Sequence, residues 1–403
     1  MKVRGIFGRY KPLAWENKSN FITDKWIETN DKAKLCIDFP DPTNPYEQVA
    51  VECPPTPNND VYVKRETVNF FQVTHNCSAS VALCNKIKVA FNDAGKELTK
   101  ILKLKQIINV NSTFTSLAPT TLGSAYSARY VPLISDDKIT RLYPQALVKQ
   151  FCLNPCPEYN AYDISARFNS DFDWWFRTDN ETIKSDQYDF YAVLLHELIH
   201  GLGFISSWSN SLETLDNRNT TGITPDFGYS DNIFSEFSEY IFDRYVKFIR
   251  NNVVCTSTDY TFQLNKAVEN GTSFNDYSEF VTKMKSSPQW KYAESALKCA
   301  TTNDSMYFTP AKDTSWNDKI YLETSFNPIV SGSSISHVSD ERYEPTEDFL
   351  MTYSFAPGES LEYLIQKGGN YKSPIGPRIL SILESIGYET DTYSNPIKPT
   401  YEY

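Results

Sequence analysis

Hydrophobic positions recur along the chain with two spacings, one helical and one typical of strands. From Val81 to Leu104 apolar residues fall at helical spacing, which predicts an amphipathic helix. Shorter runs bounded by turn residues predict strands at Lys34–Asp38, Gln48–Glu52, Gln106–Val110, Tyr130–Ile134 and Tyr162–Asn169. Between two of these strands, NSTFTSLAPTTLGSAYSAR is rich in turn residues, which predicts a loop.

A second helix is predicted at Asp186–Leu202, and apolar residues nearly surround it. This pattern places it in the core, with Gly201 and Gly203 ending it. Further helices are predicted at Phe237–Arg250, Asp276–Lys285, Trp290–Leu297 and Gly376–Ile386, and a strand at Lys319–Thr324. A helix, several short strands and a second, buried helix indicate α+β architecture.

These changes in pattern divide the chain into five regions. Residues 1–75 form an irregular N-terminal subdomain or a pro-segment, and residues 76–208 are the regular region that contains the buried helix. Residues 209–329 are a helix-rich insertion, residues 330–388 a C-terminal subdomain, and residues 389–403 a surface tail. We find no internal repeat and no low-complexity tract.

Composition narrows the class of protein. Hydrophobic residues make up 40% of the 403 residues and charged residues 22%, which is typical of a globular protein. The net charge of −11 argues against nucleic acid or an anionic membrane as the main partner. No apolar run approaches the roughly 20 residues needed for a transmembrane segment, so we expect a soluble protein.

Cysteines and glycosylation sequons predict a secreted or lumenal glycoprotein. The eight cysteines suggest disulfides, and pairing of neighbours is the simplest arrangement: Cys36–Cys53, Cys77–Cys84, Cys152–Cys156 and Cys255–Cys299. Seven sequons stand at Asn17, Asn76, Asn111, Asn180, Asn219, Asn270 and Asn303. The first 21 residues contain no apolar run long enough for a signal peptide, so either an upstream segment is missing or export follows another route.

The buried helix contains the motif HELIH at residues 196–200. His196 and His200 are four residues apart, so both imidazoles share one helix face and can bind one Zn²⁺. Glu197 projects beside that metal and can act as general base and then acid in peptide hydrolysis. The motif is short enough to occur by chance, and a buried histidine usually binds a backbone carbonyl. Half of the chain's four histidines stand here, however, and an unpartnered buried glutamate is costly, which favours a metal site.

A catalytic zinc needs a third protein ligand. The long signature HExxHxxGxxH would place it at position 206, where this chain has Ser206. Of the remaining histidines, His75 lies in a polar stretch that predicts a surface position, whereas small residues precede His337. A competing ligand is Glu239 on the predicted downstream helix, oriented by Asp243 four residues later, as in gluzincin-type peptidases.

The succession HELIHGLGF, SH and FLM resembles the metzincin zinc peptidases. The leishmanolysin branch is similar in one further respect, because its third histidine also follows a long insertion. This resemblance implies that an insertion of roughly 130 residues, Phe204–Ser336, displaces the third ligand to His337. It also implies that Met351 forms a methionine turn beneath the metal. The expected fold is a metzincin-like zincin core with a small mixed sheet, an active-site helix, a large helix-rich insertion and disulfides.

The order of further motifs extends the resemblance over about residues 80–388. Secreted proteins with HExxHGLGF show similar pieces in the same order, here FNSDFDWWF, IFDRY, GSSISH, FLM and IGPRILSILESIGY. Tyr353 stands in M-x-Y, where the family's tyrosine can reach the metal or the oxyanion, although core packing fits equally well. The aromatic run Trp174, Trp175 and Phe176 fits a cleft-lining strand or, more simply, the core.

Together these features predict a zinc-dependent endopeptidase that hydrolyses a protein or peptide substrate. His196, His200 and His337 would hold Zn²⁺, and Glu197 would be the catalytic base and acid. The first alternative is a catalytically silent binding or adhesion protein with a structural zinc site. Others are a gluzincin-type peptidase that uses Glu239 and a zymogen silenced by residues 1–75. The sequence leaves the substrate and the oligomeric state open.

Overall fold

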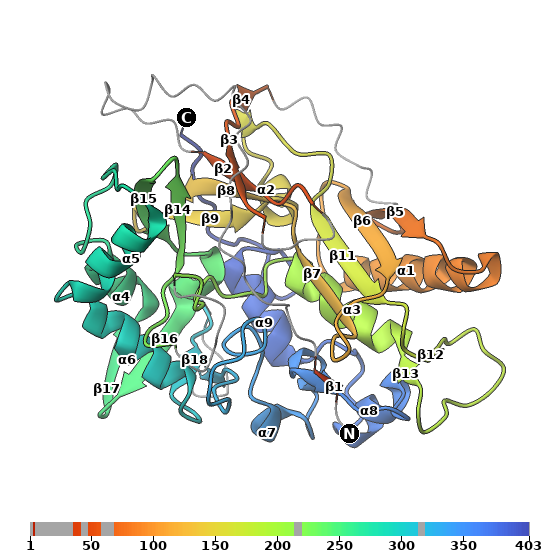
Figure 1. Ribbon diagram of the computed structural model, residues 1–403. Helices are drawn as coiled ribbons and strands as arrows, with labels where there is room; N and C mark the ends of the chain where they lie inside the picture. The colour runs from red at the N-terminus through yellow and green to blue at the C-terminus, as the bar shows by residue number, and fades with distance from the viewer. Residues whose placement is uncertain are drawn as a thin grey trace.

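A four-stranded sheet covered by two helices forms the centre of the protein, a mixed α+β fold with several small sheets (Figure 1). The computed structural model describes residues 3–4, 35–41, 47–57, 68–212, 220–312 and 319–402. The central sheet has the order β5 (Phe71–Cys77), β6 (Ile108–Thr115), β11 (Ile164–Asn169) and β7 (Gly123–Ser127). The first three strands are parallel, and β7 runs antiparallel to β11.

Helices α1 (Val81–Ile101) and α3 (Phe190–Gly201) pack against this sheet and against each other. The Ser80 side chain caps α1 by accepting a hydrogen bond from the Leu83 amide, as its position before the apolar pattern favours. Asp189 caps α3, so the helix begins four residues after the predicted start at Asp186. Tyr188–Asp189 instead forms β13, which pairs with β12 (Trp174–Trp175).

Strand β7 corrects the prediction that residues 111–129 form a loop. All five β7 residues are buried, because β11 lies beside the strand and α3 packs across it. Small residues allow this close packing but remove the alternation of polar and apolar positions that predicts a strand. Gly201 meets a similar constraint at the end of α3, where a Cβ atom would lie 2.5 Å from the Ile164 side chain.

The described residues before position 68 join the body of the protein through a second sheet, of order β3 (Val49–Val51), β2 (Cys36–Asp38), β8 (Arg129–Ile134) and β9 (Thr140–Pro144). The chain then passes through α2 (Gln145–Phe151). Two short pairings tie other segments together: β4 (Pro55–Thr56) with β10 (Cys156–Pro157), and β1 (Val3–Arg4) with β20 (Ser354–Phe355).

The region between residues 220 and 329 contains strands as well as the predicted helices. Strands β14 (Asp226–Ser230) and β15 (Ile233–Ser238) form a hairpin. A sheet has the order β17 (Val253–Thr256), β16 (Val246–Arg250), β18 (Met306–Phe308) and β19 (Ile320–Tyr321). Helices α4 (Ser257–Leu264), α5 (Tyr277–Ser286) and α6 (Trp290–Ala300) complete the region.

The predicted helix Phe237–Arg250 is wrong. A 3-10 turn, η3 (Ile241–Tyr245), lies between β15 and β16 instead. Strand β16 buries Val246 and Phe248 alternately, and pairing with β17 and β18 on its two edges decides the local structure. The other predicted helices are present, with small shifts at their ends.

The C-terminal region surrounds the end of α3. It comprises α7 (Asp340–Tyr343), the 3-10 turn η4 (Phe349–Met351), β20, α8 (Leu361–Lys367) and α9 (Pro377–Ile386). The Tyr388 hydroxyl donates to the Leu202 carbonyl oxygen over 3.0 Å, which fixes the end of α9 to the end of α3.

Two of the four expected disulfides are formed, Cys36–Cys53 and Cys77–Cys84. Cys152, Cys156, Cys255 and Cys299 are not disulfide-bonded, so the other two predicted pairs are wrong. Two of these thiols form hydrogen bonds instead. The Cys156 sulfur lies 3.3 Å from the Thr56 hydroxyl oxygen, and the Cys299 thiol donates to the Ile249 carbonyl oxygen.

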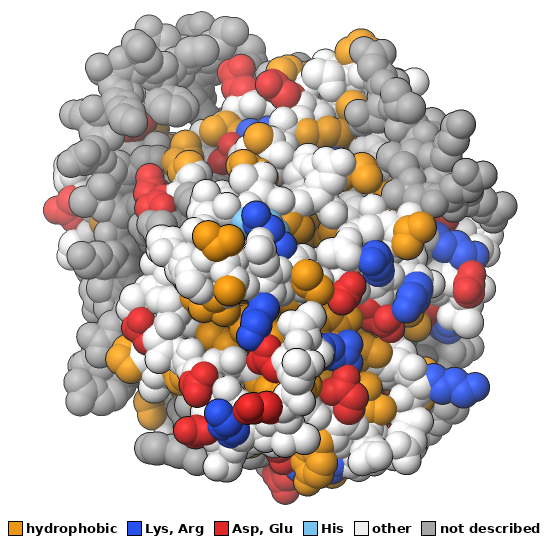
Figure 2. Space-filling view, turned by 90° about the vertical axis from the view of Figure 1, so that its right-hand side faces the viewer, with side chains coloured by type: hydrophobic (Ala, Val, Ile, Leu, Met, Phe, Trp, Pro, Cys, Tyr) orange, Lys and Arg blue, Asp and Glu red, His pale blue; other side chains and the backbone are white. Residues whose placement is uncertain are grey.

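The exposure of the sequons and the distribution of surface charge relate to the predicted glycosylation and partners. Asn111 is buried on β6, whereas Asn76, Asn180, Asn270 and Asn303 are exposed, and Asn17 and Asn219 lie outside the described residues. On the face shown in Figure 2, basic and acidic side chains are interspersed. Among the described residues, no helix is both long and apolar enough to cross a membrane.

Candidate metal centre

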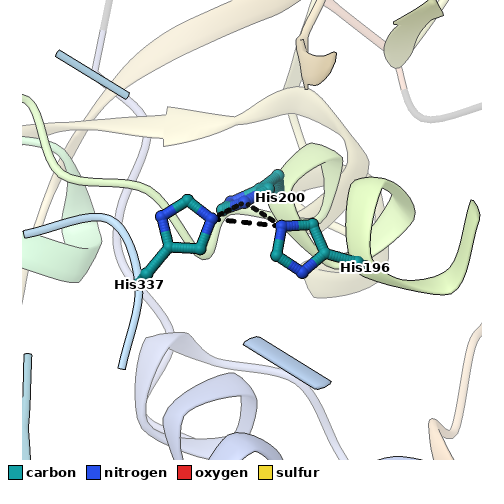
Figure 3. Close-up of side chains that lie close together, drawn as sticks. All are labelled: His196, His200 and His337. Atoms are coloured by element: carbon teal, nitrogen blue, oxygen red, sulfur yellow. Dashed lines mark hydrogen bonds between the residues drawn. The ribbon is translucent and has the colours of Figure 1, made fainter. Parts of the chain in front are cut away.

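Three histidines from two distant parts of the chain meet at one point (Figure 3). His196 and His200 lie one turn apart on α3, and His337 comes from the loop before α7. Their Nε2 atoms are 3.0, 3.1 and 3.2 Å apart, and the three residues are 1–3% exposed. Within the described residues, these three histidines form a group of side chains that could hold a metal ion.

Backbone carbonyls fix the tautomer of each ring. Every Nδ1 lies 2.6 to 3.0 Å from a carbonyl oxygen, those of Leu350, Phe204 and Ser333 for His196, His200 and His337 respectively. A carbonyl can only accept, so each Nδ1 bears the proton and each neutral ring directs an Nε2 lone pair inward. Three such acceptors only 3.0 to 3.2 Å apart repel one another unless a cation lies between them.

Burial keeps the three rings neutral. Loss of hydration lowers the pKa of His196 to about 4 and lowers the pKa values of His200 and His337 well below the usual value of 6.5. Each of the latter two is also disfavoured as a cation by the neighbouring histidines. Neutral imidazole is the form that binds a metal, so at neutral pH the ligands need not release a proton first.

The donor set fits Zn²⁺. Imidazole nitrogens bind zinc at about 2.0–2.1 Å, and tetrahedral geometry then separates ligand nitrogens by about 3.3 Å, close to the spacing found here. Backbone carbonyls that hold the second ring nitrogen are the usual outer contacts of such ligands. With three protein ligands in the described group, a fourth position remains for water or substrate, which is typical of catalytic zinc sites.

Glu197 lies on the side of α3 that faces β7. Its carboxylate accepts from the Ala125 amide, and a Cβ atom at Gly123 would lie 3.1 Å from Glu197 Cγ, so glycine makes room for it. Burial raises the pKa of Glu197 to about 8, opposed by the Ala125 amide and by Arg167. Its Oε2 atom is buried without a hydrogen-bond partner, so one acceptor of this carboxylate stays unused.

Two neighbouring segments hold the loop of His337. The Glu323 amide donates to the His337 carbonyl oxygen over 2.8 Å, and the Val338 amide donates to that of Met351 over 2.9 Å. The Glu323 carboxylate, 1% exposed, accepts from the amide of Asp340 at the start of α7. Sequence reasoning missed Glu323, although a lone charge in the apolar stretch around it was a usable signal.

Ser206 occupies the position of the missing histidine and contacts the loop that delivers His337. Its amide donates to Ser336 Oγ over 3.1 Å, and its hydroxyl donates to Asp243 over 2.6 Å. The chain that leaves α3 is therefore hydrogen-bonded to the residue directly before His337. Ser206 therefore helps to hold in place the loop that contains His337.

Glu239, the competing ligand, lies in a different cluster. Its carboxylate accepts hydrogen bonds from Arg141 at 3.3 Å and from Thr258 at 2.9 Å, and also from Ser257 and Thr261. Asp243 accepts from the side chains of Ser206 and Ser207. The helix that would have aligned Glu239 with Asp243 is absent, since β15 ends at Ser238 and η3 begins at Ile241.

The methionine segment lies beside the centre. Met351 is fully buried in η4, and the carbonyl before it, that of Leu350, binds the His196 ring. Tyr353 is half-buried, with its ring 4.7 Å from that of Phe326. The catalytic role of Tyr353 stays a prediction.

The remaining aromatic and histidine predictions concern residues away from the three rings. Trp174 and Phe176 are buried, as a core position predicts, and Trp175 is half-buried. His75 lies on β5 with its ring 5.0 Å from Phe91, half-buried under α1 rather than on the surface as predicted. Because α1 covers this strand, a polar local sequence did not imply exposure.

Known proteins give a family without an activity. The uncharacterized protein PB7E8.01 of Schizosaccharomyces pombe is 24% identical over 374 residues, which cover 83% of this chain and 65% of that protein. The chain thus spans slightly less than two thirds of that relative's length. No solved structure matches. The model of the SPBPB7E8-like family matches residues 36–403, and the chain therefore belongs to the SPBPB7E8-like family.

Proposed function

We propose that this protein is a zinc-dependent endopeptidase with a metzincin-like catalytic core. The observation that supports this most strongly is the convergence of three buried Nε2 lone pairs, each fixed by a backbone carbonyl on the opposite ring nitrogen. Glu197, on the same helix as two of the histidines and with one buried oxygen unused, would supply the acid–base group that peptide hydrolysis requires. A structural zinc site needs neither an open ligand position nor such a carboxylate.

The roles follow from chemistry and position. His196, His200 and His337 would hold the metal, and Zn²⁺, when bound, supplies a water of lowered pKa and polarises the scissile carbonyl. Glu197 would accept a proton from the attacking water and deliver it to the leaving amine. The backbone carbonyls at Leu350, Phe204 and Ser333 would keep the rings oriented during turnover.

Three further assignments belong to the same proposal. Met351 would form the methionine turn beneath the metal, since η4 lies against the end of the His196 ring. Tyr353, two residues later, would contribute to oxyanion binding. The two disulfides are typical of an oxidising compartment, which supports secretion or residence in a lumen.

The test is metal content measured together with hydrolysis. Purified protein should contain about one zinc per chain and cleave members of a quenched-fluorescence peptide library. Removing zinc with a chelator should abolish cleavage, and adding zinc back should restore it. Cleavage that survives complete zinc removal, or a zinc-loaded protein that cleaves nothing in the library, contradicts the proposal.

A further inference from the structure

One buried carboxylate joins α3, which carries two of the proposed metal ligands, to α8. Asp189 is 3% exposed and lies directly before α3. Its Oδ1 accepts hydrogen bonds from the amides of Tyr191 at 2.8 Å and Ala192 at 3.3 Å, in the first turn of α3. Its Oδ2 accepts from the amide of Leu361, the first residue of α8, at 2.8 Å. The beginnings of two helices therefore share one side chain.

A carboxylate suits this position for an electrostatic reason. The free amides at the start of a helix carry partial positive charge, so an anion placed between two helix starts is stabilised by both. The hydroxyl of Ser80, which caps α1, offers a single oxygen to one helix. A carboxylate has an oxygen for each helix. Asp189 can thus fix α3 and α8 relative to each other in addition to capping α3.

The backbone beside Asp189 strengthens this junction. The Gly358 amide donates to the Gln187 carbonyl oxygen over 2.8 Å, three residues before α8 begins. In Figure 1, α8 lies beside β13, the short strand that ends at Asp189. Two segments that are 172 residues apart in the sequence are therefore joined at two adjacent points.

The same two parts of the chain meet again at the first proposed metal ligand. The Leu350 carbonyl oxygen lies 2.6 Å from His196 Nδ1, and the Phe355 ring lies edge-on, 5.5 Å from the His196 ring between centroids. Asp189 precedes His196 by seven residues on α3, and Leu361 follows Leu350 by eleven. Because both segments are joined at both ends, a shift of α8 relative to α3 would move the Leu350 carbonyl away from the His196 ring.

We propose that Asp189 is a positioning residue of the zinc centre, which holds η4 and β20 where the Leu350 carbonyl orients His196. This inference rests on the proposed peptidase function for the presence of the metal. It adds a residue outside the ligand set on which metal affinity depends. An imidazole that is already oriented binds zinc more tightly, because less freedom is lost on binding.

The charge of Asp189 changes between neutral and mildly acidic pH. Burial raises the pKa of Asp189 to about 6, and the amides of Leu361 and Ala192 oppose this shift. Glu362 on α8 raises the pKa further and Arg177 lowers it, and these two side chains form an ion pair with each other. At about pH 5 the carboxyl is mainly protonated, so one of its oxygens becomes a donor.

The test uses Asp189→Asn, which keeps the size of the side chain but offers one acceptor oxygen and so cannot serve both helices. Zinc affinity is measured by competition with a chelator, and stability by denaturant titration. Loss of an outer contact costs roughly 10- to 100-fold in metal affinity, so we expect zinc binding to weaken about tenfold at about pH 7.5. Asp189→Ser, whose hydroxyl can cap α3 alone, should show the same loss.

Two comparisons separate positioning from a general loss of stability. Ser80→Ala removes the cap of α1 and should lower stability without changing zinc affinity. Asparagine resembles the protonated carboxyl, so the affinity ratio between the unaltered protein and Asp189→Asn should fall from about tenfold at about pH 7.5 toward one at about pH 5. A ratio that does not change with pH, or an equal loss of zinc affinity in Ser80→Ala, overturns the inference.

Cleavage measured on the same samples distinguishes this inference from the proposed function. Equal zinc affinities in the unaltered protein and both Asp189 variants, with normal cleavage, overturn the positioning role and leave the peptidase intact. Zinc affinity that depends on Asp189, without cleavage of any library peptide, does the reverse. Failure of the unaltered protein to bind zinc overturns both.

Discussion

Two buried polar clusters lie side by side in this protein and differ in how their hydrogen bonds are satisfied. Glu239 and Asp243 are 2% and 0% exposed, about as buried as the three histidines, yet donors surround them. Arg141, two threonines and three serines supply those donors. In the histidine cluster, by contrast, three acceptors converge on one another. On the same helix, the Oε2 atom of Glu197 has no hydrogen-bond partner.

Whether every buried polar group is hydrogen-bonded distinguishes a structural cluster from a functional one. Burying polar groups is tolerated when every group is paired, and the Glu239 cluster meets that condition with residues of this chain alone. In the histidine cluster three ring nitrogens face one another, and a cation bound between them would satisfy all three. Ser206 joins the two, with its hydroxyl on Asp243 and its amide on Ser336.

The largest effect is expected at the third proposed ligand. His337→Ala should leave only traces of zinc after dialysis and reduce hydrolysis by at least about 1,000-fold, because zinc and Glu197 act together. Glu239→Gln keeps the shape of the rival ligand and should retain about one zinc per chain. Zinc analysis of both variants checks this, and zinc loss from Glu239→Gln alone would reverse the assignment.

The next largest effect is a loss of stability expected in the Glu239 cluster, whose hydrogen bonds are all formed within the chain. Arg141→Met should lower the free energy of unfolding by about 3 kcal/mol, because it leaves the Glu239 carboxylate buried without its cationic partner. Zinc content should not change. Denaturant titration measures the loss, and Lys100→Met, which breaks an exposed pair with Glu97, is the control with an expected change below about 0.5 kcal/mol. Equal losses in both variants would contradict the contrast drawn between buried and exposed pairs.

A smaller effect is expected at the link between the clusters. Ser336→Ala removes the acceptor of the Ser206 amide and should cost about 1–2 kcal/mol of stability. Because it loosens the residue before His337, zinc affinity should also fall about tenfold in a chelator competition. Ser295→Ala removes a buried hydroxyl that bonds Tyr260 and should leave zinc affinity unchanged. If both variants bind zinc like the unaltered protein, Ser336 does not position the ligand.

The smallest effect concerns the histidine outside both clusters. Burial, and to a lesser extent Lys88, lowers the pKa of His75 to about 4, so the unfolded chain binds this proton first as pH falls. The stability that His75 contributes is present above about pH 6.5 and is lost toward pH 4. After allowance for its partial exposure, His75→Gln should reduce the stability difference between pH 7 and pH 5 by no more than about 1 kcal/mol. Denaturant titrations of both proteins at the two pH values measure this difference. A variant whose stability depends more strongly on pH than that of the unaltered protein would contradict the prediction.

Sequence patterns predicted helices better than the strands that form the site. Helices α1 and α9 each have one continuous apolar face, which determines their structure locally. Strand β7 has small residues buried on both faces, and its structure depends on α3 and β11, which no local pattern records. Residues 246–250 form strand β16 rather than helix because β17 and β18 pair with its two edges.

The sequence predicted the proposed metal ligands but not the residues that hold them in position. The spacing of His196 and His200 is local, and the residues before His337 were identified through a family resemblance. The roles of Ser206, Ser336 and Glu323 depend on contacts across more than 10 residues of sequence, up to 130 between Ser206 and Ser336. Such pairings require the folded chain.

We propose that the histidine cluster and Glu197 together perform hydrolysis, and replacing Glu197 alone separates catalysis from metal binding. Zinc-loaded Glu197→Ala protein is compared with the unaltered protein for cleavage of the same peptide, with zinc content measured on both samples. We expect about one zinc per chain in each and a loss of cleavage of roughly 100- to 10,000-fold in the variant. Full activity in a Glu197→Ala protein that still holds its zinc would contradict the account.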